Sequence, residues 1–135
     1  MTSDAPAVRR KRPAKPQFAQ TILVLEALCV LFATLVAYGL RAAAPGLVWA
    51  VGGGLALLLV VVAGMVGRPG GYALGWVAQV WLVIAALLLP AVARDIAVLV
   101  ALVFVALWVM AIRIGGRIDR ERAEYDAAHP GAVGP

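Results

Sequence analysis

The stretch QTILVLEALCVLFATLVAYGL, from Gln20 to Leu40, decides the fold of this chain. It is almost continuously apolar and is long enough to cross the roughly 30 Å hydrocarbon core of a bilayer as a helix. Glu26 lies inside it and is the only acidic residue in any long apolar stretch of the chain. Because an ionisable group at the centre of a membrane helix costs about 3 kcal/mol on insertion scales, we expect Glu26 to face a partner, a cavity or a proton path.

Three more apolar stretches follow, and the connections between them are too short for a soluble domain. The chain is 64% hydrophobic and 14% charged, whereas a typical soluble domain is about 25% charged. Lipid offers no hydrogen-bond partner to the backbone, and the apolar runs do not alternate as in β-barrel strands, so each run is predicted to be a helix. The sequence therefore predicts an all-α, integral membrane four-helix bundle (18–114) with spans at 20–40, 46–66, 72–91 and 96–114.

Basic residues are distributed unevenly between the two ends of the predicted bundle. Ten of the twelve Lys and Arg residues fall in the N-terminal tail, the second connection or the C-terminal end, whereas Arg41 and Arg94 fall on the other side. By the positive-inside rule this bias predicts a multi-pass plasma-membrane protein with both termini in the cytoplasm. Aromatic residues that suit the membrane–water interfaces as anchors are Tyr38, Trp49, Tyr72, Trp76 and Trp108.

The N-terminal tail, residues 1–17, contains three prolines and no apolar periodicity, so we expect a disordered cytoplasmic arm. Near an anionic inner leaflet each basic residue gains about 1 kcal/mol of attraction, which favours binding to membrane lipids. Nucleic-acid binding is the competing interpretation of such a run. We favour lipids because orientation and lipid contact already account for the charges. The residues concerned are Arg9, Arg10, Lys11, Arg12 and Lys15.

The C-terminal tail, residues 115–135, begins with a glycine pair and continues with charged residues. Three arginines each precede an acidic residue by four positions, a spacing that weakly supports a helix. The fourth span is therefore expected to continue as a short helical extension, which is either solvated or docked on a cytoplasmic partner.

Polar residues inside the third and fourth spans offer partners for Glu26. Gly71, Gly75 and Gln79 recur every four residues, so they share one helix face, and the two glycines allow another helix to approach closely. Glu26 and Gln79 both lie about 9 to 11 Å from the starts of their spans, so they can meet if the first and third helices are adjacent. Arg113 either extends to the lipid phosphates or turns inward to complete a cluster with them.

The remaining motifs do not support catalysis. The three consecutive glycines 52–54 resemble a phosphate-binding loop, but they lie within the second span, where close helix packing by Gly52, Gly53 and Gly54 is expected instead. The chain has one Cys, one His in the C-terminal tail, no serine in the spans and no acidic pair. Nucleophilic catalysis and metal ligation both lack their usual residues, so we expect no enzyme activity, no metal and no cofactor.

Three segments resemble a known family: Leu25 to Ala27, GYALGWVAQV from Gly71 to Val80, and FVALWVMAIRIGGRID from Phe104 to Asp119. They are similar to small actinobacterial four-helix membrane proteins that are often encoded beside folylpolyglutamate synthase. The resemblance covers roughly residues 18 to 120. That family has no established activity, so the resemblance implies a membrane location and an actinobacterial source rather than a reaction.

Two functions remain open at this point. One is a structural or accessory protein whose bundle associates with itself or with a larger membrane complex. The other is a small proton-coupled exporter that uses Glu26, because small multidrug-resistance transporters also have four short helices with an essential glutamate in the first. Those exporters assemble as antiparallel dimers, whereas the strong charge bias here favours one orientation, so we favour the accessory function.

Overall fold

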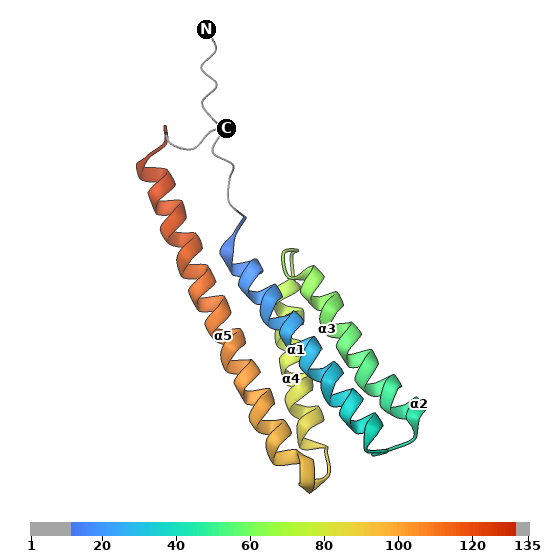
Figure 1. The fold of residues 1–135 in the computed structure, drawn as a ribbon. Coiled ribbons are helices and arrows are strands. Elements are labelled where there is room, and N and C mark those ends of the chain that lie inside the picture. Colours follow the sequence, from blue (N-terminus) through green and yellow to red (C-terminus); the bar gives the residue numbers. More distant parts are fainter. Residues whose placement is uncertain (1–11, 132–135) are drawn as a thin grey trace.

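The computed structural model describes residues 12–131 and folds them into an up-and-down bundle of helices (Figure 1). The second membrane-length segment, Pro45–Met65, is one continuous helix that includes a π-helical turn. The elements are α1 (Ala14–Gly39), α2 (Pro45–Val48), η1 (Trp49–Gly53), α3 (Gly54–Met65), α4 (Gly71–Leu87) and α5 (Ala91–Ala128). The described part of the chain contains no strand, and the predicted all-α bundle is confirmed.

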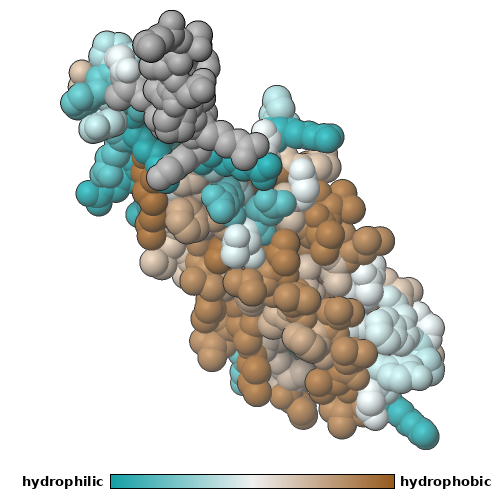
Figure 2. All heavy atoms as spheres, turned by 45° about the horizontal axis from the view of Figure 1, so that its top comes forward, coloured by the Kyte–Doolittle hydropathy of each residue, from teal (hydrophilic) through white to brown (hydrophobic). Residues whose placement is uncertain are grey.

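Helix lengths fit a bilayer. Three helices are long and apolar enough to cross a membrane: α1, the continuous rod Pro45–Met65, and α5. Helix α4 is apolar but has 17 residues, which is the lower end of the roughly 17 to 25 that a span needs. In Figure 2 a broad apolar belt covers the middle of the molecule, and hydrophilic residues gather at its ends. These features indicate a membrane protein.

Proline and glycine set the ends of the helices. Helix α4 ends at Leu87 rather than at the predicted residue 91, and α5 begins at Ala91 rather than at 96, because Pro90 lies between them. Proline lacks an N–H and restricts the residue before it, so it ends one helix and favours the start of the next. At the other end of α4, Gly70 precedes the helix with a φ of 81°, a backbone conformation that favours glycine.

The tails are more helical than the sequence indicates. Helix α1 already begins at Ala14, within the stretch predicted to be disordered, while residues 1–11 of that stretch lie outside the described residues. Helix α5 continues through the glycine pair to Ala128 and extends beyond the other helices (Figure 1). Of its three expected ion pairs, the described residues form Arg117 with Glu121 at 2.8 Å, and both side chains are largely exposed.

The order of the helices around the bundle, which the sequence left open, follows from the contacts between them. Helix α1 packs mainly against α3 and α5, and α4 also packs against α3 and α5, so α1 and α4 lie across the bundle from each other. The apolar core fills the space between them. It comprises Ala19, Leu23, Ala27, Leu59, Val62, Ala63, Val66, Ala78 and Trp108.

Candidate functional site

Helix α1 carries Glu26 on its buried face. Leu23 and Ala27, on either side of Glu26 in the sequence, are also buried, and this spacing places all three on one face. Glu26 itself is only 2% exposed. The carboxyl group therefore points into the bundle and not toward lipid.

Glu26 meets Gln79 across the centre of the bundle. The Nε2 atom of Gln79 donates a hydrogen bond of 2.6 Å to Oε2 of Glu26, and Gln79 is 1% exposed. Their depths along α1 and α4 are matched, although the two helices are diagonal and not adjacent. The bond therefore links two helices whose backbones do not pack side by side.

Trp108 of α5 closes the core next to this pair. It is fully buried, and a Cβ atom added at Gly75 would collide with its indole ring. Trp76 packs edge-on against it, with ring centroids 6.5 Å apart. The prediction that Trp108 is an interface anchor is thus corrected, because glycine at position 75 leaves room for a large aromatic ring inside the bundle.

Three buried polar atoms at this place have no hydrogen-bond partner among the described residues: Oε1 of Glu26, Oε1 of Gln79 and Nε1 of Trp108. A buried polar group without a partner costs about 1–3 kcal/mol. The two oxygens can each accept a hydrogen bond and the indole N–H can donate one, whereas of the three groups only the carboxyl of Glu26 exchanges a proton. Among residues 12–131, no three His, Cys, Asp or Glu side chains lie close enough together to hold a metal ion.

The structure does not bring Arg113 to this pair. Arg113 is exposed and forms no hydrogen bond or ion pair with the described residues. It lies five residues after Trp108, which places it about 140° around α5 from the inward-facing indole. Because Trp108 takes the inward position, Arg113 points outward, the first of the two orientations that the sequence left open.

The other glycines singled out in the sequence divide into two groups. A Cβ atom at Gly71 would collide with the backbone of Met65, and one at Gly52 would collide with the side chain of Thr34. These two positions therefore allow close packing. A Cβ atom at Gly53 would contact only Trp49 of the same helical segment, at 3.6 Å, and one at Gly54 would contact nothing. Glycine is therefore not needed for helix packing at either position.

The proposed interface anchors other than Trp108 lie at or near the surface. Tyr38 and Trp49 are exposed and pack together at the α1–α2 turn, with ring centroids 5.9 Å apart. Tyr72 is partly buried, and the Nζ atom of Lys15 lies 4.4 Å from the centre of its ring. Among the basic residues assigned to lipid binding, Arg12 is exposed. Residues 9–11 lie outside the described residues.

Asp119 is a structural residue that the sequence did not reveal. Its carboxylate accepts hydrogen bonds from the backbone N–H groups of Ala14, at 2.6 Å, and Lys15, at 3.0 Å. It thereby caps the first turn of α1 from α5, since Pro13 before that turn supplies no side-chain cap.

Electrostatics at this cap favour the charged form of Asp119. Partial burial raises the pKa of this carboxyl, but the two backbone hydrogen bonds, together with the charges of Arg122 and Lys15, outweigh burial and lower the pKa below its ordinary value. The α1 cap is therefore a carboxylate at neutral pH.

The sequence contains signals for the burial of Trp108, which we predicted to be an interface anchor, and for the cap by Asp119. Ala101, Trp108 and Gly115 recur every seven residues and form the buried stripe of α5. Asp119 follows Gly115 by four positions and so shares its face. A Cβ atom at Gly115 would collide with Lys15, so this glycine allows α1 to approach Asp119.

Comparison with known families gives one match. The family described as protein of unknown function (DUF4233) covers residues 17–124, from the first turns of α1 into the extension of α5. The chain belongs to this family. The match therefore includes Glu26, Gln79 and Trp108, as well as Asp119. No curated protein and no solved structure matches the chain.

Proposed function

We propose that this DUF4233 protein is a non-enzymatic accessory or assembly component of the plasma membrane, which associates with itself or with a larger membrane complex. The burial of Glu26 carries the proposal. Its carboxyl is 2% exposed, bonded to Gln79 and enclosed by the core, which suits a fixed polar contact between helices. An open groove elsewhere in the bundle, between α1 and α3, has Leu25 in its lining but not Glu26.

The surface supports association within the membrane. Large apolar side chains are exposed on every long helix, and α5 extends past the bundle as a charged rod. A partner can therefore contact the apolar belt, the extension or both. We expect no bound cofactor and no nucleic-acid partner.

Mild extraction tests the accessory function. The full chain is extracted directly into lipid nanodiscs, without prior detergent, and its mass is measured by native mass spectrometry. We expect a homo-oligomer or a complex of defined stoichiometry, and the same sample in a harsh detergent provides the dissociated control. A monomer alone in the nanodiscs would contradict the proposal.

Orientation is part of the proposal. The start of α1, the α3–α4 turn and the extension of α5 form one end of the bundle, here called the basic end, with Arg12, Arg68 and Arg117, while Arg41 and Arg94 lie toward the other. We infer that the basic end faces the cytoplasm. Cysteines placed at positions 68 and 94 in a Cys29→Ala background test this. Labelling of position 68 by an impermeant reagent from outside would reverse the orientation.

A second candidate function is proton-coupled export through Glu26. The observation that favours it is the buried carboxyl of Glu26, whose Oε1 atom has no hydrogen-bond partner among the described residues, since a transported proton needs an ionisable group inside the membrane. Proton flux is measured in reconstituted vesicles as a panel of organic cations is added, with Glu26→Gln as the matched variant. Export predicts flux that the variant loses. No flux from the unmodified protein across the panel would eliminate this function.

A further inference from the structure

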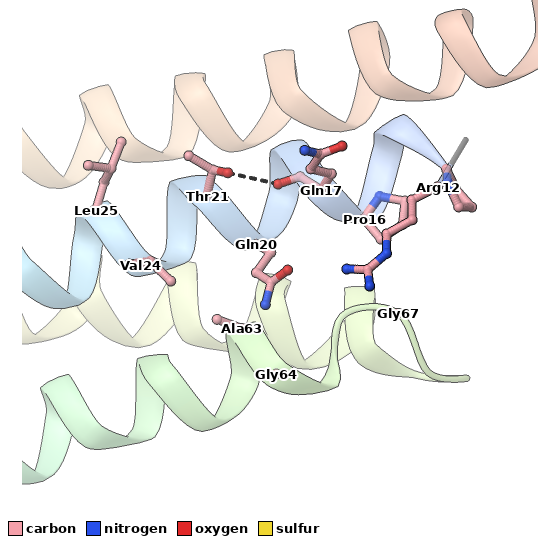
Figure 3. A pocket seen from close by; sticks show the side chains of 11 residues that line it. Arg12, Pro16, Gln17, Gln20, Thr21, Val24, Leu25, Ala63, Gly64 and Gly67 are labelled. Carbon is pink, nitrogen blue, oxygen red and sulfur yellow. Dashed lines mark hydrogen bonds between the residues drawn. The ribbon is translucent and has the colours of Figure 1, made fainter. Parts of the chain in front are cut away.

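A groove of about 610 Å³ lies along the first turns of α1 at the basic end, where the end of α3 forms its opposite wall (Figure 3). Its lining extends from Arg12 to Leu25 on one side and from Ala63 to Gly67 on the other. The part of this lining that lies in α1, from Pro16 to Leu25, rises about 14 Å along the helix at 1.5 Å per residue. The groove therefore reaches from headgroup level into one leaflet of a bilayer whose hydrocarbon core is roughly 30 Å thick.

Hydrogen-bond donors lie at the outer part of this groove. In Figure 3 the side chains of Arg12, which precedes α1, and Gln20 of α1 point toward α3, whereas Gln17 and Thr21 point toward α5. Arg12 brings a positive charge, and the described residues that line the groove include no carboxylate. The charge of the groove thus complements an anion.

The inner part of the groove is apolar and is lined by small side chains on the α3 side. Val24 lies on the α1 side, and Ala63 and Gly64 form the α3 wall. Gly64 is exposed, and a Cβ atom added there would meet nothing within 4 Å. A hydrocarbon chain can therefore lie against this wall without displacing any side chain.

We propose that this groove binds one anionic phospholipid of the inner leaflet, with its phosphate between Arg12 and Gln20 and one acyl chain between Val24 and Gly64. A soluble anion would leave the apolar half of the groove unfilled, and a cation would face Arg12. Guanidinium groups bind phosphate oxygens with paired hydrogen bonds, which suits a headgroup at this position. The inference goes beyond the accessory function and rests on the proposed orientation only in naming the inner leaflet.

Native mass spectrometry of the delipidated full chain tests the proposal. The protein is titrated with phosphatidylglycerol and, separately, with phosphatidylcholine of the same acyl chains. We expect one phosphatidylglycerol to remain bound preferentially. Arg12→Ala should weaken its binding about fivefold, the equivalent of the roughly 1 kcal/mol that one basic residue contributes near an anionic lipid. Arg68→Ala removes the same charge at the same end outside the groove lining and should change binding little.

A second variant tests the apolar half. Gly64→Leu is expected to fill the groove and weaken the binding of both lipids. Because a Cβ atom at Gly64 meets nothing within 4 Å, we expect the bundle to keep its fold, and circular dichroism checks this. Equal retention of the two lipids, equal loss with Arg12→Ala and Arg68→Ala, or unchanged binding with Gly64→Leu would each overturn the proposal. Displacement of the lipid by millimolar inorganic phosphate would also overturn it, because it would identify a site for free phosphate.

Discussion

The hydrogen bond between Glu26 and Gln79 predicts a measurable energetic coupling between α1 and α4. We consider the variants Glu26→Leu and Gln79→Leu, singly and together. Each single change leaves a buried polar side chain without its partner, because both residues are at most 2% exposed. Such an orphaned group costs about 1–3 kcal/mol. The double variant removes both polar groups and keeps similar volume, so its loss should be smaller than the sum of the single losses.

The size of the coupling follows from the single bond. Hydrogen bonds between membrane helices contribute about 0.6 kcal/mol on average and up to about 1.7 kcal/mol. The Gln79 to Glu26 distance of 2.6 Å and the full burial of the pair place it toward the upper part of that range. We therefore expect a coupling of about 1 kcal/mol or more.

Reversible unfolding in mixed micelles, titrated with sodium dodecyl sulfate and followed by tryptophan fluorescence, measures the four free energies of unfolding. In that assay the helices stay within the micelle, so the difference reports contacts between helices. Thr21→Val is the matched control, since Thr21 is exposed and its hydroxyl donates only to the Gln17 carbonyl of its own helix. A coupling below about 0.3 kcal/mol would mean that the two positions act independently and would refute the reasoning.

The remaining predictions concern packing, capping and surface charge, and the same unfolding assay measures them. Gly75→Ala should lower the free energy of unfolding by about 1–2 kcal/mol because its Cβ collides with Trp108, whereas Gly64→Ala, which meets nothing, should be neutral or slightly stabilising; equal effects would contradict the packing. Asp119→Asn should cost about 1 kcal/mol by weakening the α1 cap. Because the pKa of Asp119 is lowered in the fold, the stabilisation by its carboxylate should be complete above the ordinary pKa of 3.8 and disappear as the pH falls through the folded pKa. A difference in stability between the unmodified protein and the Asp119→Asn variant that persists well below the folded pKa would contradict the cap. Arg113→Ala should change the free energy of unfolding by less than about 0.5 kcal/mol, since the side chain is exposed, and a larger loss would place Arg113 in the core network.

Local patterns were sufficient to predict much of the candidate site. The repeat of Gly71, Gly75 and Gln79 defines one face of a helix from spacing alone, and the structure buries all three. The depth of Glu26 follows from its position in α1 because the rise per residue is constant. The sequence could not place Arg113, since a long side chain near a helix end reaches either lipid or core.

The orientation of α5 about its own axis explains why the burial of Trp108 and the cap by Asp119 were not predicted. Helix α5 has apolar residues on all sides of its membrane part, so hydropathy does not distinguish the face with Trp108 from a lipid-facing one. The close contact between Gly75 of α4 and Trp108 of α5 determines which face of α5 points inward, and this contact joins residues on different helices. The cap by Asp119 likewise joins positions more than 100 residues apart.

By itself the sequence determined that this chain forms a bundle of four apolar helices with one carboxyl at a defined depth in the first. It does so because hydrocarbon requires apolar length and internal backbone hydrogen bonds, which are local properties of each segment. Only the tertiary structure decided that α1 and α4 lie across the bundle, that Glu26 bonds to Gln79 through its centre, and that Trp108 rather than Arg113 fills the space beside them. These features depend on which side chains from distant segments fit together. Gly75 leaves room for Trp108, and Glu26 and Gln79 lie within hydrogen-bond distance, only in this arrangement of the helices.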